Sequence, residues 1–330
     1  MARRVGIELE LLAPPGSSRA ALAAAVADEI GGAVTRGWHH DSEPSAHPQF
    51  ATFRHLTPAF DVADAAGEPY LRIVDDITIT DDLERGAPSP DGWQRIISDD
   101  ARLLHMVAHH LPVTGIDGNA VAAAAEVMGL TWGEKDGTFR LAGPNDAAVA
   151  LITGVPGDRC RVAECISPPL TNGVDEWLER IVAVATKLGC AVPAEGATHA
   201  HYDAAPFRTH EALARLAWAF SDGDIDLIRT RFATNPRCRR IGALPAGLVE
   251  LVESDEYDAL SWDEVATRVR GVEGITKYAD VNVLHLVAER PRTDTVEFRM
   301  LPSSLDVTEL HQLRGDLDRL VDHILNEPGG

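Results

Sequence analysis

Residues 6–11 read Gly-Ile-Glu-Leu-Glu-Leu, an alternation of apolar and acidic side chains near the start of the chain. Side chains two positions apart in a β-strand point to the same face. The isoleucine and the leucines therefore share one face, and Glu8 and Glu10 share the other. This alternation predicts a strand over residues 3–12 with one apolar face and one face that carries two carboxylates. Taken alone, the acidic pair also fits the solvent-facing side of a half-buried strand.

The same pattern returns in two later stretches of the chain. His199 and His201 alternate with other residues in Thr-His-Ala-His-Tyr-Asp, and Glu297 and Arg299 alternate with apolar residues in Val-Glu-Phe-Arg-Met. A single acidic residue, Glu164, interrupts the apolar stretch Val-Ala-Glu-Cys-Ile. Individually, the histidine pair also fits a structural or solvent-facing role, and the last pair also fits a cross-strand salt bridge. Their occurrence together in one chain favours a shared site.

Ionisable groups in this number are costly inside a protein unless a cation or hydrogen-bond donors compensate them. Hard carboxylate oxygens are the ligands that Mg²⁺ and Mn²⁺ prefer, and an imidazole is compatible with either ion. A nearby arginine would complete a phosphate site, because its planar fork binds two phosphate oxygens at once. The combined set therefore predicts a site for a divalent cation and a phosphate group.

The rest of the chain alternates irregularly between predicted helices and strands. Helical periodicity covers residues 174–188 and 306–325, and strand patterns cover residues 197–204, 280–287 and 293–301. Because the strands are not evenly separated by helices, the pattern favours an α+β fold with a mostly antiparallel sheet over a doubly wound fold.

The composition changes between about residues 36 and 92. Proline, histidine and aspartate accumulate there, and only short pieces such as residues 70–80 resemble strands. We therefore expect an irregular insertion at about 36–92, which would serve as a lid or substrate lobe. It would belong to a single catalytic domain that spans residues 1–330.

Charge and cysteine content limit the compartment and the partners. The chain has 51 acidic and 30 basic residues, a formal charge of −21 that repels polyanions, so we expect no nucleic-acid partner. None of the four cysteines stands in a C-x-x-C pair, which argues against a zinc or redox motif. The first residues carry charges where a signal peptide needs apolar ones, and no run of about 18 apolar residues could span a membrane. We expect a cytoplasmic protein with no membrane partner.

Five segments, taken in order, resemble the amidoligase family, whose relatives are glutamine synthetase and glutamate–cysteine ligase. They are G-I-E-L-E at 6–10, A-E-C-I-S-P-P-L at 163–170, T-H-A-H-Y-D-A at 198–204, K-Y-A-D-V-N-V at 277–283 and T-V-E-F-R-M-L at 295–301. Each motif is short, but five in the right order across most of the chain form a specific signal. The resemblance implies a glutamine-synthetase-like catalytic fold, in which a curved sheet carries the metals on its concave face and helices pack behind it.

The resemblance also implies a metal-binding role for five residues. Glu8 and Glu10 match the carboxylates of the first strand that hold divalent metal, and Glu164 matches a further metal-binding glutamate. His199 matches a histidine near the second metal. Glu297 matches the late ligand that lies under the transferred phosphate.

Other positions match residues that contact the nucleotide. Arg299 matches the phosphate-binding arginine, and His201 matches a neighbour of the nucleotide or its phosphates. Asn282 and Lys277 belong to a more variable motif of the same region. Arg239-Arg240 resembles a basic patch that would meet phosphates, although a simple exposed turn explains this pair equally well.

The resemblance implies a ligase that uses ATP and Mg²⁺, or Mn²⁺, to join a carboxylate to an amine through an acyl phosphate, giving an amide or isopeptide bond. Glu297, Arg299 and Glu164 would contribute directly to catalysis. The substrates would be small molecules, peptides or protein tails, and the oligomeric state is open. Two alternatives stay open as well. One is a metal-dependent hydrolase that uses His199 and His201 as ligands, and the other is an inactive member that acts as a binding module.

Overall fold

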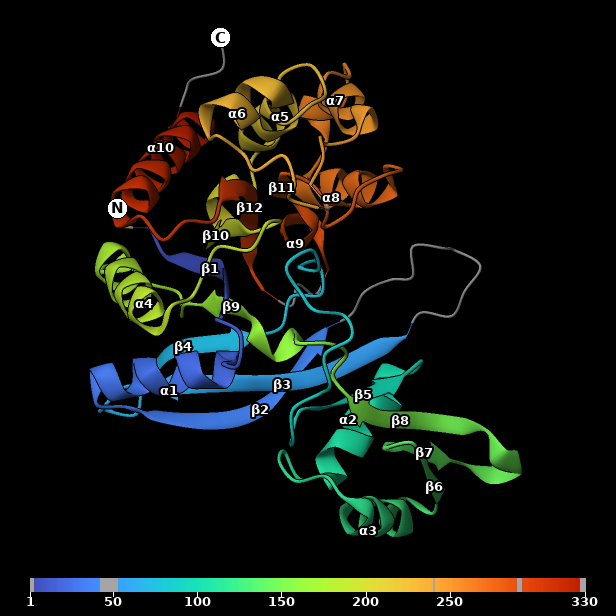
Figure 1. Ribbon diagram of the computed structural model, residues 1–330. Coiled ribbons are helices and arrows are strands. Elements are labelled where there is room, and N and C mark those ends of the chain that lie inside the picture. Colours follow the sequence, from blue (N-terminus) through green and yellow to red (C-terminus); the bar gives the residue numbers. More distant parts are fainter. Residues whose placement is uncertain (1–2, 42–52, 240, 290–292, 327–330) are drawn as a thin grey trace. The chain divides into compact units, whose positions relative to one another are not determined.

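The structure is a computed structural model that describes residues 3–41, 53–239, 241–289 and 293–326 (Figure 1). Contacts within the chain group it into two compact units. The first unit comprises Met1–Glu10, Ser167–Ala183 and Val192–Gly330, and the second comprises Leu11–Ile166 and Val184–Ala191. Among the described residues, no helix combines the length and the apolar character that a membrane crossing requires.

The first unit combines a small antiparallel sheet with most of the helices in the second half of the chain. Strand β1 (Val5–Leu12) and helix α4 (Val174–Leu188) begin in this unit, and their last residues are assigned to the second. The other elements are β10 (Ala197–Asp203), η3 (Ala205–Phe207), α5 (His210–Ala219), α6 (Ile225–Arg231), α7 (Ala246–Val252), η4 (Tyr257–Ala259), α8 (Trp262–Gly271), β11 (Val281–Asn282), α9 (Leu284–Val287), β12 (Thr295–Pro302) and α10 (Val307–Asn326).

The strands of the first unit follow the order β11-β12-β10-β1, and each neighbouring pair is antiparallel. Their apolar face includes Ile7 and Ala200, which line a small apolar cavity together with Leu178 of α4 and Leu313 of α10. The hydroxyl of Tyr202, on the same face, donates a 2.7 Å hydrogen bond to Asp318 of α10. Because cross-strand partners share a face, the opposite face of these strands is the one that carries the predicted polar residues.

The second unit contains a longer antiparallel sheet in the order β9-β4-β3-β5-β8-β7-β6, in which β2 also pairs with β3. Helix α1 packs on β2, β3 and β4, whereas α2 and α3 pack on β3 and on β5 to β8. The elements are α1 (Arg19–Ile30), β2 (Ala33–Asp41), β3 (Arg54–Ala63), β4 (Pro69–Val74), β5 (Gln94–Ser98), α2 (Ala101–His110), α3 (Gly118–Met128), β6 (Thr131–Lys135), β7 (Thr138–Ala142), η1 (Pro144–Asp146), β8 (Ala148–Gly154), η2 (Arg159–Arg161) and β9 (Val162–Ile166).

The mixture of helices with a large, open antiparallel sheet confirms the predicted α+β class. Two local predictions need correction. Residues 36–92 are irregular only in part, because β3, β4 and most of β2 lie in this range and pair in one sheet, whereas residues 75–92 contain no helix or strand. Residues 280–287 are not one strand, because only Val281–Asn282 is extended before α9 begins at Leu284. The role of 36–92 as a lid, and the single catalytic domain, stay predictions.

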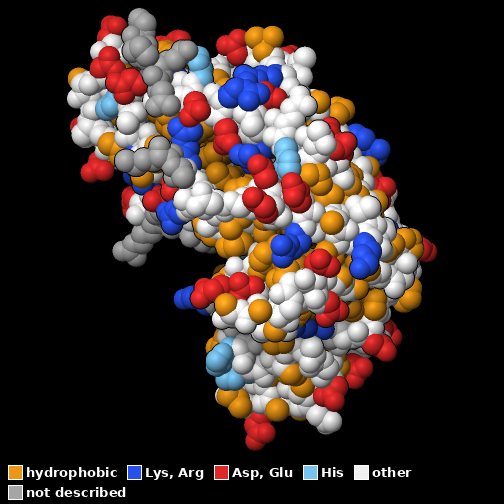
Figure 2. Space-filling model, turned by 90° about the vertical axis from the view of Figure 1, so that its left-hand side faces the viewer, with side chains coloured by type: hydrophobic (Ala, Val, Ile, Leu, Met, Phe, Trp, Pro, Cys, Tyr) orange, Lys and Arg blue, Asp and Glu red, His pale blue; other side chains and the backbone are white. Residues whose placement is uncertain are grey.

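The surface in Figure 2 fits the expectation from the charge balance. On that face, lysine and arginine side chains are scattered among acidic ones and form no continuous basic surface. A nucleic-acid backbone is usually met by a clustered basic surface. The absence of nucleic acid among the partners stays a prediction.

Candidate metal site

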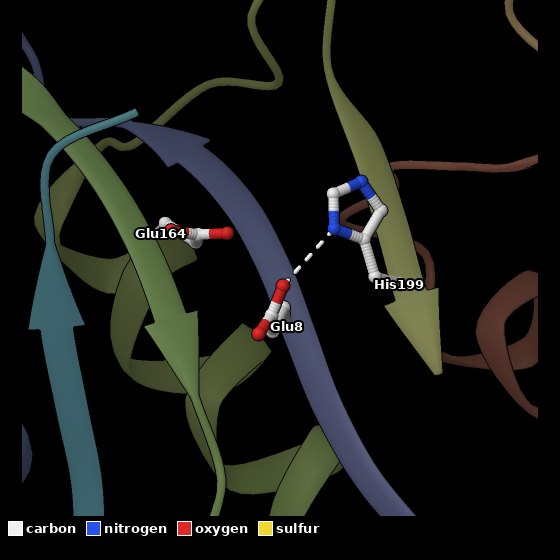
Figure 3. A group of neighbouring side chains, drawn as sticks. All are labelled: Glu8, Glu164 and His199. Carbon is white, nitrogen blue, oxygen red and sulfur yellow. Dashed lines mark hydrogen bonds and ion pairs between the residues drawn. The ribbon is translucent and has the colours of Figure 1, made fainter. Parts of the chain in front are cut away.

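The pairing of β1 with β10 brings the first acidic pair to the histidines. Glu8 lies opposite His199 in the register, and Gly6 lies opposite His201. One carboxylate oxygen of Glu8, Oε2, lies 3.0 Å from His199 Nδ1, and the other, Oε1, lies 3.1 Å from His201 Nε2. Figure 3 shows the Glu8 carboxylate directed at the His199 ring. Glu8 therefore contacts both histidines.

The next strand, β12, adds a second carboxylate from a distant part of the sequence. Glu297 lies opposite His201 in the β10–β12 register. Its Oε1 atom is 3.4 Å from His199 Nδ1 and 3.9 Å from His201 Nε2. One ligand atom each from Glu8, His201 and Glu297 lies within 4.8 Å of the others. This spacing suits three ligands of one cation.

Glu10 is the most buried of these carboxylates, with a relative exposure of 3%. Its Oε2 atom accepts a 2.8 Å hydrogen bond from the backbone N–H of Ala197. Its Oε1 atom lies 3.5 Å from His199 Nε2. One oxygen is thus held by the backbone, which fixes the direction of the other toward the histidine.

Asn282 holds Glu297 in a similar way. It lies opposite Glu297 in the β11–β12 register, and its side-chain amide donates a 2.8 Å hydrogen bond to Glu297 Oε2. Glu297 Oε1 is the oxygen that faces the histidines. The predicted membership of Asn282 in the site region therefore has a geometric basis, as a residue that orients a carboxylate.

Arg299 lies where the β10–β12 pairing is irregular. The register shifts between Thr198 and Ala200, and the backbone N–H of Arg299 donates to the carbonyl of Asp280 at 2.8 Å. The guanidinium forms an ion pair with Glu297. Burial lowers the pKa of Arg299, but the charges of Glu297 and its acidic neighbours outweigh this and raise it above its usual value. Arg299 is therefore a permanent cation next to the carboxylates.

Sequence reasoning missed Asp280, which supports this part of the site. Asp280 is fully buried, and its carboxylate accepts hydrogen bonds from Arg229 Nε at 3.0 Å and Nη2 at 2.7 Å. Its carbonyl receives the N–H of Arg299, and two residues later the chain presents Asn282. The signal in the sequence was the i, i+2 polar pair Asp-Val-Asn, the same alternation that marks the other strands.

The acidic and basic groups strongly influence one another's protonation. Burial lowers the pKa of His201, but the charges of Glu8 and Glu297 outweigh it and raise the pKa to about 9. Burial raises the pKa of Glu8, yet the two histidines bring it well below its usual value. The pKa of Glu297 is also lowered, because Arg299 and His201 overcome the effect of burial. Glu8 and Glu297 are therefore ionised in the folded protein.

This set of donors fits a hard divalent cation. Carboxylate oxygens with one or two imidazole nitrogens are ligands that Mg²⁺ and Mn²⁺ accept. His201 Nε2 lies 3.1 Å from Glu8 Oε1, so both atoms can face a common ion. The residues available to hold the ion in the first unit are Glu8, Glu10, His199, His201 and Glu297.

The other predicted residues have different surroundings. Glu164 lies in β9 of the second unit, half-buried, and its role as a metal ligand stays a prediction. Arg239 forms an ion pair of 3.6 Å with the buried carboxylate of Glu195, whereas Arg240 lies outside the described residues. Lys277 is exposed, with its ammonium 5.1 Å from the ring centre of Tyr278. Phosphate contacts of these three basic residues stay predictions.

Comparison with known proteins identifies a family. A family model described as "Putative amidoligase enzyme" matches residues 1–313, a range that includes all five sequence motifs. No curated protein and no solved structure gives a significant match. The glutamine-synthetase-like fold therefore stays a prediction.

Proposed function

Because the chain belongs to the amidoligase family, we propose that it is an ATP-dependent ligase that joins a carboxylate to an amine. The proposed reaction has two steps. An oxygen of the substrate carboxylate attacks the γ-phosphorus of ATP, and ADP leaves. The amine nitrogen then attacks the acyl phosphate carbon, a proton is lost from nitrogen, and inorganic phosphate leaves as the amide forms.

One observation carries this proposal: three carboxylates, two of them with lowered pKa values, and a partly buried arginine share one face of β1, β10 and β12. Carboxylates alone would repel a triphosphate, so this face suits ATP only when a cation is bound. A bound Mg²⁺ or Mn²⁺ would supply positive charge to the phosphate oxygens during transfer. Glu8, Glu10 and Glu297, with His199, would hold it.

The chain's own residues then position and stabilise the reactants. Arg299 would bind phosphate oxygens with its planar fork, since it lies beside Glu297 at the cation face. Asn282 keeps Glu297 oriented. His201, whose Nε2 atom lies 3.9 Å from Glu297, would be a second contact near the phosphate. Phosphoryl transfer depends chiefly on positioning and charge, so no side-chain nucleophile is needed.

Metal binding is the first test, and it requires no substrate. Calorimetry with Mn²⁺ should show binding to the wild-type protein, and Glu297→Gln should weaken it by at least roughly tenfold, because a charged ligand is lost. Glu250→Gln is the matched control, since Glu250 is an exposed carboxylate of the same unit. ATP should bind with Mg²⁺ and only weakly with EDTA. Equal Mn²⁺ affinity in wild type and Glu297→Gln would contradict the proposal that Glu297 is a metal ligand.

The second test concerns the chemistry. A screen of carboxylate and amine pairs should find pairs that release ADP, and a carboxylate labelled with ¹⁸O should then give labelled phosphate. Label in AMP would indicate an adenylating ligase instead. Turnover without ATP would favour the hydrolase that uses His199 and His201. Either result would contradict the acyl phosphate route.

A further inference from the structure

A polar pocket lies within the second unit, and its lining includes none of the residues proposed for the metal site. Its volume is about 220 Å³. The polar side chains that line it are His55 and Thr57 of β3, Arg95 of β5, Asp75 after β4, and Arg159 of η2. A water molecule occupies about 30 Å³ in the liquid, so the pocket has room for a small molecule or one end of a larger one.

Strand alternation explains why polar residues gather there. Leu56 pairs with Ile96 across β3 and β5, and both belong to the core that packs on α2 and α3. The flanking residues point to the opposite face, because side chains alternate along a strand. His55, Thr57 and Arg95 therefore share the face that is turned away from this core.

Two of the charged groups in the pocket are already paired. Arg159 donates to Asp75 through Nε at 3.1 Å and through Nη2 at 2.8 Å, and its Nη1 atom donates to the carbonyl of Ile79 at 3.1 Å. The fully buried Arg19 lies 4.0 Å from the same aspartate. Asp75 is therefore neutralised by neighbouring arginines.

Three other polar atoms of the pocket are buried without a hydrogen-bond partner among the described residues. They are His55 Nδ1, Thr57 Oγ1 and Arg95 Nε. Thr57 has a relative exposure of only 3%. Buried polar groups in native proteins are nearly always paired, so an unpaired set that lines one pocket calls for a ligand.

The charges define what such a ligand would be. The lining contains two guanidinium groups against one carboxylate, in a chain whose formal charge is −21. Arg95 makes no ion pair with any described residue, and arginine stays charged in proteins. Burial, together with the charges of Arg95 and Arg159, lowers the pKa of His55 to about 4, so its neutral ring adds a donor or acceptor without charge.

We propose that this pocket binds a small oxyanion group, a carboxylate or a phosphate, through Arg95 and Thr57. The guanidinium would donate to the anion oxygens and the hydroxyl of Thr57 would add a third hydrogen bond. One unpaired positive charge matches a carboxylate better than a phosphate dianion. The inference does not depend on ligase chemistry, because it uses no residue of the candidate metal site.

The test follows the ring signals of histidine by NMR in the full-length protein, in a buffer without carboxylate or phosphate and with ionic strength held constant with chloride. The His55 signal is identified by its loss in His55→Gln. Acetate and phosphate are titrated separately. Saturable movement of the His55 signal is expected, with acetate as the tighter ligand, and the apparent affinity should fall by at least roughly tenfold in Arg95→Gln, which loses a charge-assisted contact. Arg85→Gln, at an exposed arginine of the same unit, should behave as wild type.

Thr57→Val keeps the shape of the side chain, so it should preserve the fold and weaken anion binding. If Arg95→Gln does not fold, the anion affinity of Thr57→Val tests the proposal instead. Saturation by phosphate alone would identify a phosphate group, and saturation by acetate alone a carboxylate. Both results support an oxyanion site. A His55 signal that does not saturate with either anion would overturn the proposal, and so would equal affinity in wild type and the folded pocket variants.

Discussion

Replacing His55 by glutamine tests the electrostatics of the oxyanion pocket in the second unit. His55 is half-buried in β3, and the charged groups that act on it are Arg95, Arg159, Asp75 and His40. Burial and the two arginines disfavour its protonated form, and Asp75, which is paired with Arg159, opposes them with a smaller effect. The net effect lowers the pKa of His55 from 6.5 to about 4.

This shift makes the stability of the protein depend on pH in one direction. Below pH 6.5 the unfolded chain binds a proton at His55, whereas the folded protein binds it only near pH 4. The free energy of unfolding therefore falls as the pH falls from 6.5 to 4. The difference between the two pKa values corresponds to about 3 kcal/mol at most. Because the ring is partly exposed, screening by water reduces the expected loss to roughly 2 kcal/mol.

The assay compares wild type with His55→Gln, which keeps a polar side chain but cannot titrate. Urea unfolding and hydrogen exchange of the β3 peptide would be measured from pH 7 to pH 4.5, in buffers without carboxylate or phosphate. The stability advantage of wild type over His55→Gln should shrink by roughly 2 kcal/mol across this range. His109→Gln replaces an exposed histidine of the same unit and should run parallel to wild type.

A constant difference between wild type and His55→Gln would refute the reasoning, because it would mean that His55 has the same pKa in both states. A difference that grows on acidification would refute it more strongly. That result would show that the folded protein holds the proton, with Asp75 as the dominant neighbour rather than the arginines.

Other perturbations have simpler expectations. Asp75→Asn should lower the free energy of unfolding, measured with urea, by about 3–5 kcal/mol, because Arg159 loses the buried carboxylate to which it donates two hydrogen bonds. A loss under about 1 kcal/mol would contradict this expectation. Ser261→Ala should cost about 1 kcal/mol, because it removes the capping box of α8, and hydrogen exchange should show fraying confined to that helix. A thiol reagent should modify Cys238 before Cys190, because burial raises the pKa of the Cys190 thiol to about 11. Peptide mass spectrometry would follow the order of modification, and the reverse order would contradict this expectation.

Several elements could be predicted because local sequence carries the relevant physics. The helix α4 begins and ends at the predicted residues, 174 and 188, since its apolar periodicity is strong and Gly189 follows it. The i, i+2 pairs predicted polar faces on β1, β10 and β12, and the structure places those faces together. Alternation predicts the face of a side chain because it depends only on strand geometry.

Residues 36–92 show where local reasoning fails. The strands β2 and β3 pair along their length from Ala33–Ala63 to Asp41–His55, although the segment is rich in proline and histidine. Strand preference depends on packing against neighbouring strands, so a weak local pattern can still form a regular strand. Asn282 illustrates the reverse case, because a strong apolar pattern over 280–287 yields only a short strand before α9.

The sequence by itself determined the types of ligand in the candidate site and the strands that carry them, because strand alternation and the chemistry of carboxylates, imidazoles and guanidinium groups are local properties. Tertiary structure decided which oxygen of Glu297 faces the histidines, through the amide of Asn282, and which side chains form the oxyanion pocket. Glu8 and His199 are 191 residues apart, and their contact depends on the register between β1 and β10. That register is set by the burial of the whole apolar face of the sheet, which no single stretch of sequence contains.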